Sequence, residues 1–123
     1  MPEDDPVLAS EPVKWAAEFR FFARDRRVHA WSPYRLDGAP ARDGDNWVVR
    51  PEMAAAVSDL ADRLFADPRV NLPAALVIDA GVIWDVGPAV VEANQASGAG
   101  IYGCDPRDVL EVLRAATIAS PRI

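Results

Sequence analysis

Two acidic residues and one amide lie at a spacing that could hold a divalent cation. Asp79 follows the apolar run "ALVI", and Glu92 and Asn94 follow a second apolar run "AVV". If the two runs are strands of a hairpin whose turn centres near Asp85 and Val86, then Asp79 lies opposite Glu92, and Asn94 projects from the same face. Carboxylate and amide oxygens are the ligands that Mg²⁺ prefers. The spacing therefore indicates a magnesium site on the hairpin.

The charge of this pair requires a positive partner. Like charges directly opposite each other destabilise a sheet, and at about 5 Å with an effective dielectric near 20 the repulsion is roughly 3 kcal/mol. A hard divalent cation between Asp79 and Glu92 would remove this repulsion. In the alternative interpretation, Asp79 begins a turn, Glu92 lies at the surface, and a slip of one residue separates them.

The segment after the hairpin contains the glycine pattern of a dinucleotide-binding loop, G-x-G-x-x-G, at Gly98–Gly103. Such a loop works inside a βαβ unit with an acidic residue about 20 positions further on. Only "TIASPRI" follows the next helix, and the charges of Asp105 and Asp108 oppose a phosphate at its N-terminus. We interpret the glycines as a flexible connection, or as a loop that touches a substrate bound beside it.

Two strands are expected upstream, because apolar and charged residues alternate in residues 14–23. One face of this strand is apolar, with Trp15, Ala17, Phe19, Phe21 and Ala23. The other face is charged, with Lys14, Glu18 and Arg20. A turn at residues 24–27 and a strand at residues 28–35 complete a hairpin, and the Gly-, Asp- and Pro-rich residues 36–46 predict a surface loop.

Helical spacing of apolar residues predicts a helix over residues 51–66, beginning with Pro51. The strands of the second hairpin are expected at residues 74–80 and 89–94. A last helix is expected from the N-cap Asp105 to about residue 116, with Cys104 packed beside it. The order β-β-α-β-β-α predicts an α+β fold, an antiparallel sheet of two hairpins with helices packed on one face.

The composition limits the possible partners. The 123 residues have a net charge of −6, with twelve scattered arginines and Lys14 as the single lysine, which argues against nucleic acid. The acidic start and the lack of a long apolar run argue against a signal peptide and a membrane span, and the lone Cys104 suits a reducing cytoplasm. We expect one domain over residues 1–123, with an acidic segment at residues 1–10 and a core at residues 11–118.

The hairpin residues resemble a known family. Asp79 on one strand and Glu92-x-Asn94 on the next are similar to the magnesium-binding signature of the ATP-grasp superfamily. Members of this superfamily activate a carboxylate as an acyl phosphate and pass it to an amine or another nucleophile. The resemblance implies the C-terminal lobe of an ATP-grasp fold, with Mg²⁺ and ATP as cofactors and a small-molecule or peptide carboxylate as substrate.

The resemblance extends along most of the chain, from about residue 7 to residue 113. "SEPV" (10–13) resembles the hinge strand beside the adenine, and "EFR" (18–20) and "SPY" (32–34) resemble segments of a small, poorly characterised branch. In that branch the E-x-N segment runs into a loop that ends in a pattern like "GIYGCD" (100–105).

The resemblance also implies roles for individual residues. Asp79, Glu92 and Asn94 would hold one or two Mg²⁺ ions that bridge the ATP phosphates. Arg20 would lie near the γ-phosphate or the acyl phosphate, and Glu18 would orient Arg20 or the ribose. The remaining roles fall to Arg35, for a substrate carboxylate, and to Glu11 and Val13, at the adenine hinge. Without the resemblance, Glu18 and Arg20 are interpreted as an exposed cross-strand ion pair of little energetic weight.

The chain departs from the family pattern at its N-terminus, because no lysine-bearing lobe that clamps the nucleotide fits into residues 1–6. Three functions therefore stay open. The chain could be half of an ATP-dependent ligase that needs a lobe from a partner chain, a remnant that binds metal or nucleotide without chemistry, or an interaction module that forms a homodimer.

Overall fold

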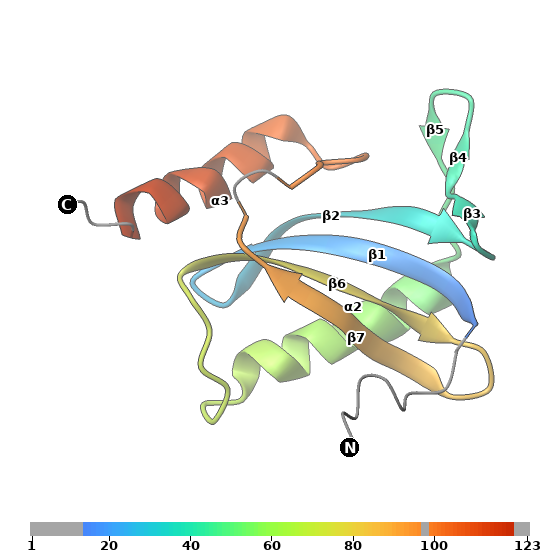
Figure 1. Cartoon of the computed structure of the whole chain (residues 1–123), viewed down its shortest axis with the longest axis horizontal. Coiled ribbons are helices and arrows are strands. Elements are labelled where there is room, and N and C mark those ends of the chain that lie inside the picture. Colours follow the sequence, from blue (N-terminus) through green and yellow to red (C-terminus); the bar gives the residue numbers. More distant parts are fainter. Residues whose placement is uncertain (1–13, 97–98, 120–123) are drawn as a thin grey trace, which may run out of the picture.

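The structure, a computed structural model, describes residues 14–96 and 99–119 (Figure 1). Its main elements are β1 (Trp15–Arg24), β2 (Arg27–Leu36), α2 (Pro51–Ala66), β6 (Ala75–Ile83), β7 (Gly87–Asn94) and α3 (Pro106–Ala119). The order β-β-α-β-β-α and the α+β class predicted from the sequence are confirmed. The predicted surface loop contains three short strands, β3 (Ala39–Pro40), β4 (Arg42–Asp43) and β5 (Asn46–Trp47).

The main sheet has five strands in the order β3-β2-β1-β6-β7, with antiparallel pairing throughout. Tight turns join the strands of each hairpin. Asp25 and Arg26 have φ values of 51° and 65°, and Asp85 has a φ of 67°. Backbone in this left-handed region matches the twist of the strands that it joins. The predicted turns at residues 24–27 and near Asp85 are therefore confirmed, and β1 lies between β2 and β6 at the centre of the sheet.

The helices cover opposite faces of the sheet, whereas the sequence predicted both on one face (Figure 1). Phe21 packs in a core with Val57 of α2, and its neighbour Phe22 packs in a second core with Val112 of α3. Successive side chains of a strand point to opposite faces. The prediction of one face failed because Phe22 interrupts the charged face of β1 and packs with α3, and Arg24 on the same face donates to Glu111 of α3.

The second core holds the single cysteine of the chain. Cys104 is 5% exposed and packs with Val109, as the sequence predicted. Asp105 caps α3, because its Oδ1 accepts a hydrogen bond of 2.8 Å from the backbone N–H of Arg107. These contacts fix the start of α3 close to the sheet.

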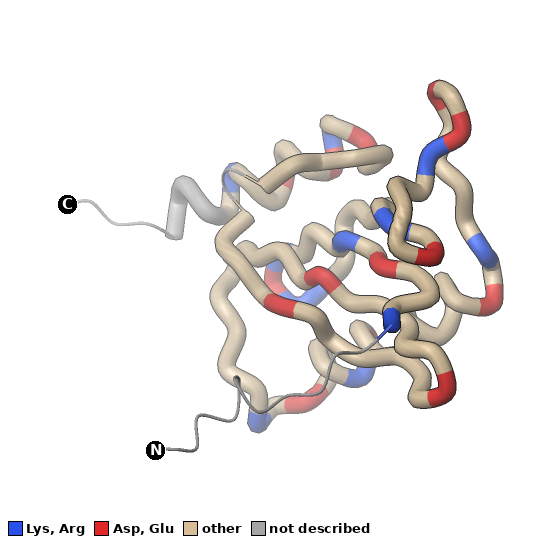
Figure 2. The backbone as a smooth tube through the Cα atoms, turned by 45° about the vertical axis from the view of Figure 1, so that its right-hand side comes forward, with Lys and Arg blue, Asp and Glu red and all other residues tan. Residues whose placement is uncertain are grey.

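Charged positions are interspersed over the described part of the chain, with basic and acidic residues as neighbours in many places (Figure 2). Of the helices in residues 14–96 and 99–119, none is long and apolar enough to cross a membrane.

Candidate functional site

Four polar residues lie side by side across the sheet and form what we call the polar row. Arg20 on β1 pairs with Ser32 on β2 and with Asp79 on β6, and Asp79 pairs with Glu92 on β7. The row faces the α3 side, because Phe22 lies two positions from Arg20 and packs in the α3-side core. The predicted hairpin register, with Asp79 opposite Glu92, is confirmed.

Arg20 and Asp79 form a bidentate ion pair in the middle of the row. The guanidinium donates from Nε to Oδ1 and from Nη2 to Oδ2, both at 2.8 Å. The Arg20 side chain is 13% exposed and Asp79 is 2% exposed. The hydrogen bond to Asp79 raises the pKa of Arg20, so the guanidinium stays charged. The positive partner that the sequence required beside Asp79 is therefore present as Arg20.

Glu18 has other partners. Its carboxylate accepts a hydrogen bond of 3.1 Å from the Tyr34 hydroxyl and lies 3.8 Å from Nε of Arg35. The Glu18 side chain is 13% exposed. Burial raises the pKa of the Tyr34 hydroxyl, so this group stays a donor at neutral pH. The interpretation of Glu18 and Arg20 as an exposed ion pair is wrong, because Arg20 pairs with Asp79 and both side chains are mostly buried.

Residues 99–105, which precede α3, contact the row at Arg20. Nη1 of Arg20 donates a hydrogen bond of 3.0 Å to the Gly100 carbonyl. The Arg20 guanidinium lies 5.0 Å from the centre of the Tyr102 ring and 5.7 Å from that of Tyr34. The two tyrosine rings stack at 5.0 Å with an interplanar angle of 13°. The glycine-rich segment thus contacts the polar row through its backbone and one aromatic side chain.

A β-bulge brings an indole to the same face of the sheet. Trp15 pairs with Ile83 and Ala17 pairs with Val82, so Ala16 is an extra residue in β1. This shift reverses the direction of Trp15, which the strict alternation in the sequence placed with Ala17 on the apolar face. The ring lies so close to Gly81 that a Cβ there would approach Trp15 Cε3 to 2.9 Å.

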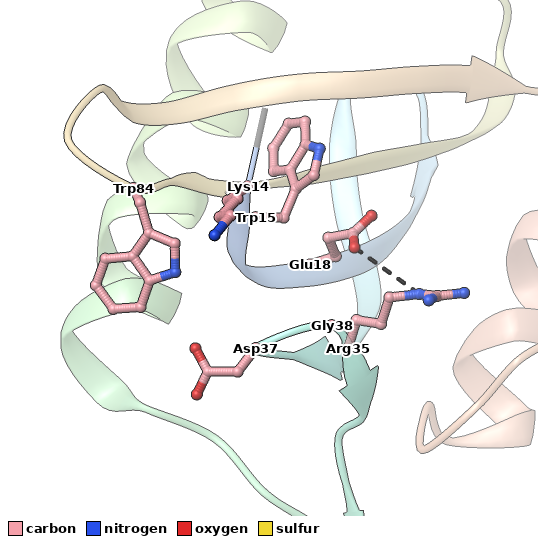
Figure 3. A pocket seen from close by; sticks show the side chains of 7 residues that line it. All are labelled: Lys14, Trp15, Glu18, Arg35, Asp37, Gly38 and Trp84. Atoms are coloured by element: carbon pink, nitrogen blue, oxygen red, sulfur yellow. Dashed lines mark ion pairs between the residues drawn. The ribbon is translucent and has the colours of Figure 1, made fainter. Parts of the chain in front are cut away.

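A hollow of about 440 Å³ lies on this face of the sheet, and Figure 3 shows the residues that line it. Glu18 and Arg35 line it, together with two indoles, one lysine and the turn after β2, namely Lys14, Trp15, Asp37, Gly38 and Trp84. Glu18 lies two positions from Arg20 on β1, so the hollow and the polar row adjoin. Pockets that bind small molecules have volumes of about 300–1,000 Å³.

The predicted metal ligands share one face but differ in their surroundings. Asp79 is buried, whereas Glu92 and Asn94 are exposed on the edge strand β7. Both oxygens of Asp79 accept from Arg20, and each keeps a second lone pair. In the described part of the chain, no cluster of three or more His, Cys, Asp or Glu side chains is placed to hold a metal ion. Of the predicted ligands, the oxygen donors that have no ion pair among the described residues are those of Glu92 and the Asn94 amide, next to an Asp79 already paired with Arg20.

The described structure brings most of the sequence-predicted site residues to one face. These residues are Glu18, Arg20, Arg35, Asp79, Glu92 and Asn94. The hinge residues Glu11 and Val13 lie outside the described residues. Sequence reasoning gave no role to Trp15, Tyr34 or Tyr102. For the two tyrosines a signal existed in the segments "SPY" and "GIYGCD", whereas a β-bulge leaves no mark in the sequence at Trp15.

A protein-family model matches most of the chain. A family model described as an ATP-grasp domain, the second family of its clade, matches residues 1–112. The chain belongs to the ATP-grasp superfamily. The ATP-grasp match covers every residue of the polar row and of the hollow. A search of curated proteins and a search of solved structures found no significant match to the chain.

Proposed function

We propose that this ATP-grasp domain binds Mg-ATP on the α3-facing side of its sheet, with the phosphates at the polar row and the nucleoside in the adjoining hollow. In a complete enzyme this site would form an acyl phosphate from a small-molecule or peptide carboxylate, for ligation to an amine or a similar nucleophile. A lobe supplied by a partner chain, or by a second copy of this chain, stays a prediction.

The main support is the arrangement of Arg20. A guanidinium has five N–H donors, and Asp79 and Gly100 accept three of those on Arg20. One donor on each Nη nitrogen is not used by the described residues. Such a pair suits the oxygens of a phosphate, and a guanidinium held in place stabilises charge that develops during phosphoryl transfer without having to reorganise.

Mg²⁺ would lie between the polar row and the phosphates, held by Glu92, Asn94 and the remaining lone pairs of Asp79. When bound, the ion supplies positive charge that neutralises the phosphate oxygens. Asp79 would orient Arg20 through its ion pair and would also bind the ion through its remaining lone pairs. Glu92 is exposed and has no ion pair in the described part of the chain, so its charge is available to a cation.

The hollow suits the nucleoside. Trp15 and Trp84 offer indole faces on which a planar base can stack, and Lys14 adds a positive charge (Figure 3). Glu18 would accept from a ribose hydroxyl, because Tyr34 and Arg35 already hold its carboxylate in place. Arg35 is 54% exposed at its side chain and can also reach a substrate carboxylate.

Titration calorimetry with Mg-ATP tests this proposal, and Glu92→Gln is the variant to use because its side chain is exposed and its loss leaves no buried charge. We expect Glu92→Gln to weaken Mg-ATP binding at least tenfold. The matched control is Glu52→Gln, the same change at an exposed position on α2, across the sheet. Absence of binding by the wild type, or equal effects of the two variants, would contradict the proposal.

One observation favours a second candidate, a domain that binds metal or nucleotide without turnover. Glu92 and Asn94 are exposed on an edge strand, and an open site neither excludes water nor encloses a transition state. Thermal unfolding with Mg-ATP and an assay of phosphate release separate the two functions. Stabilisation by Mg-ATP without phosphate release supports the second candidate, and release that is lost in Glu92→Gln supports the first.

A further inference from the structure

We propose that Tyr102 is the positioning residue for Arg20, and that its ring holds the guanidinium so that the unused Nη donors face an incoming phosphate-type anion. This role rests on the proposed function in one respect, namely that the anion is part of the bound nucleotide. The family match covers Tyr102 but assigns no role to it.

The first support is the way the guanidinium is enclosed. Asp79 fixes the Nε side of Arg20 through two bonds of 2.8 Å. The Gly100 carbonyl fixes Nη1 from the other side at 3.0 Å. The centre of the Tyr102 ring lies 5.0 Å from the guanidinium carbon, closer than that of Tyr34 at 5.7 Å, so an aromatic ring shields the guanidinium. Without the ring, water would compete with the Gly100 carbonyl for its Nη1 donor, and with an anion for the unused Nη donors.

The second support is that Tyr102 acts through its ring. The ring stacks on Tyr34 at 5.0 Å and meets the Trp47 ring edge-on at 5.7 Å, with an interplanar angle of 81°. The Tyr102 hydroxyl makes no hydrogen bond to any residue that the structure describes. Phenylalanine at this position therefore keeps every contact on which the proposal depends, whereas alanine removes them all.

The third support is that the chain is anchored at Gly103, directly after Tyr102. The Gly103 backbone N–H donates a bond of 2.9 Å to Oγ of Ser32, which is 1% exposed. Trp47 packs on Gly103 so closely that a Cβ there would approach its Nε1 to 2.7 Å. Tyr102 itself has a φ of 48°, a conformation that non-glycine residues keep only where their surroundings enforce it. The anchored loop therefore holds this ring in place against the backbone's own preference.

Two measurements on the full chain test the proposal: pyrophosphate affinity by calorimetry, and exchange of the Arg20 Nε–H with solvent by NMR. We expect Tyr102→Ala to weaken pyrophosphate binding at least fivefold and to speed the exchange at least fivefold. We expect Tyr102→Phe to stay within twofold of the wild type on both. The control variant is Leu110→Ala, which shortens an exposed aliphatic side chain on α3. Tyr102→Leu fills similar space without an aromatic face and replaces Tyr102→Ala if that variant does not fold.

The outcomes separate this role from the proposed function. If the wild type binds pyrophosphate and Tyr102→Ala does so equally well, the Tyr102 role is overturned and the proposed function stands. If Tyr102→Phe loses as much as Tyr102→Ala, the hydroxyl is responsible and the proposal is also overturned. If the wild type binds neither ATP nor pyrophosphate, the proposed function fails, and the Arg20 exchange rate alone decides whether Tyr102 positions the guanidinium.

Discussion

Arg20 and Asp79 determine how the polar row can be tested. A buried ion pair adds little stability compared with an apolar pair of the same shape, but removing one partner leaves an uncompensated charge. Asp79 is 2% exposed, so a variant at this position changes both the ligand site and the fold. Glu92 is exposed, so its variants test the proposed ligand site without disturbing the fold.

We predict that Asp79→Ala lowers the free energy of unfolding by about 3–5 kcal/mol, because it leaves the Arg20 guanidinium buried without its carboxylate. The double variant Arg20→Met with Asp79→Leu should recover most of this loss, because it removes both charges and fills the space. Urea denaturation followed by circular dichroism measures both values. A double variant no more stable than Asp79→Ala would show that the loss comes from packing rather than from charge.

Cys104 provides a second residue-scale prediction, since it is the single cysteine of the chain. Burial raises the pKa of its thiol from 9.0 to about 11. A thiol pKa of about 11 in place of 9.0 leaves about 100-fold less thiolate at neutral pH. We therefore expect a thiol reagent to react at least 100-fold more slowly with the folded chain than with the chain in urea. The folded chain's rate should rise with pH up to about pH 11.

The raised pKa also affects stability. The unfolded thiol ionises near its ordinary pKa of 9.0, whereas the folded thiol resists ionisation up to about 11. The unfolded state therefore binds fewer protons over this range, and stability should fall as the pH rises from 9 to 11. Cys104→Ala lacks this contribution, so a fall that is equal in that variant would assign it to other groups.

At the scale of elements, the sequence predicts a helix or strand correctly where its apolar residues repeat at a regular spacing over several positions. Helix α2 runs from Pro51 to Ala66, the range predicted from its helical spacing. Strands β6 and β7 have the predicted register, because a short turn near Asp85 allows few others. The short strands β3, β4 and β5 were missed, since two-residue strands have no period.

The contacts of the site depend on which strands and loops become neighbours. The sequence alone does not predict these neighbours. Asp79 lies 59 positions from Arg20 along the chain, and only the pairing of β6 with β1 brings the two together. The bulge at Ala16, which turns Trp15 into the hollow, is likewise set by this pairing. The sequence alone does not place Arg20 in space, so a metal ion is the only positive partner for Asp79 that the spacing predicts.

The contact between the β4–β5 hairpin and the β7–α3 loop gives an element-scale prediction. Gly103→Ala should displace Trp47, because the new Cβ would approach Nε1 of that indole to 2.7 Å. The chain contains four tryptophans, so ¹⁹F NMR of fluorotryptophan-labelled protein can follow each one. We expect the Trp47 resonance to move and that of Trp84 to stay.

Gly100→Ala is the matched control in the same loop. A Cβ at Gly100 would lie 3.7 Å from Nη1 of Arg20, which is an ordinary contact, so the Trp47 resonance should not move. Equal shifts of the Trp47 resonance in both variants would show that the loop, rather than its contact with Trp47, responds to the substitution.

At the scale of the whole molecule, the sheet separates two cores with different relations to the site. The α2-side core includes Phe19, Phe21 and Val57, and the α3-side core includes Phe22, Val77 and Val112. The polar row continues the α3-side face, and the loop that holds Arg20 leads directly into α3. A disturbance of α3 should therefore reach the site, whereas one of α2 has the sheet between itself and the site.

Val57 and Val112 allow a matched test of this separation, because both are 0% exposed and lie on helices that cover opposite faces. Valine to alanine removes two buried carbons at either position. Each carbon contributes about 0.8 kcal/mol, and the cavity adds to the cost, so we expect each variant to lose about 2–3 kcal/mol in free energy of unfolding. The two variants should thus unfold at similar urea concentrations. Only Val112→Ala should speed exchange of the Arg20 Nε–H, because α3 and the preceding loop share the face on which Arg20 is held. Faster exchange in Val57→Ala to the same degree would mean that the two faces are coupled through the sheet, and that the site depends on global stability rather than on α3.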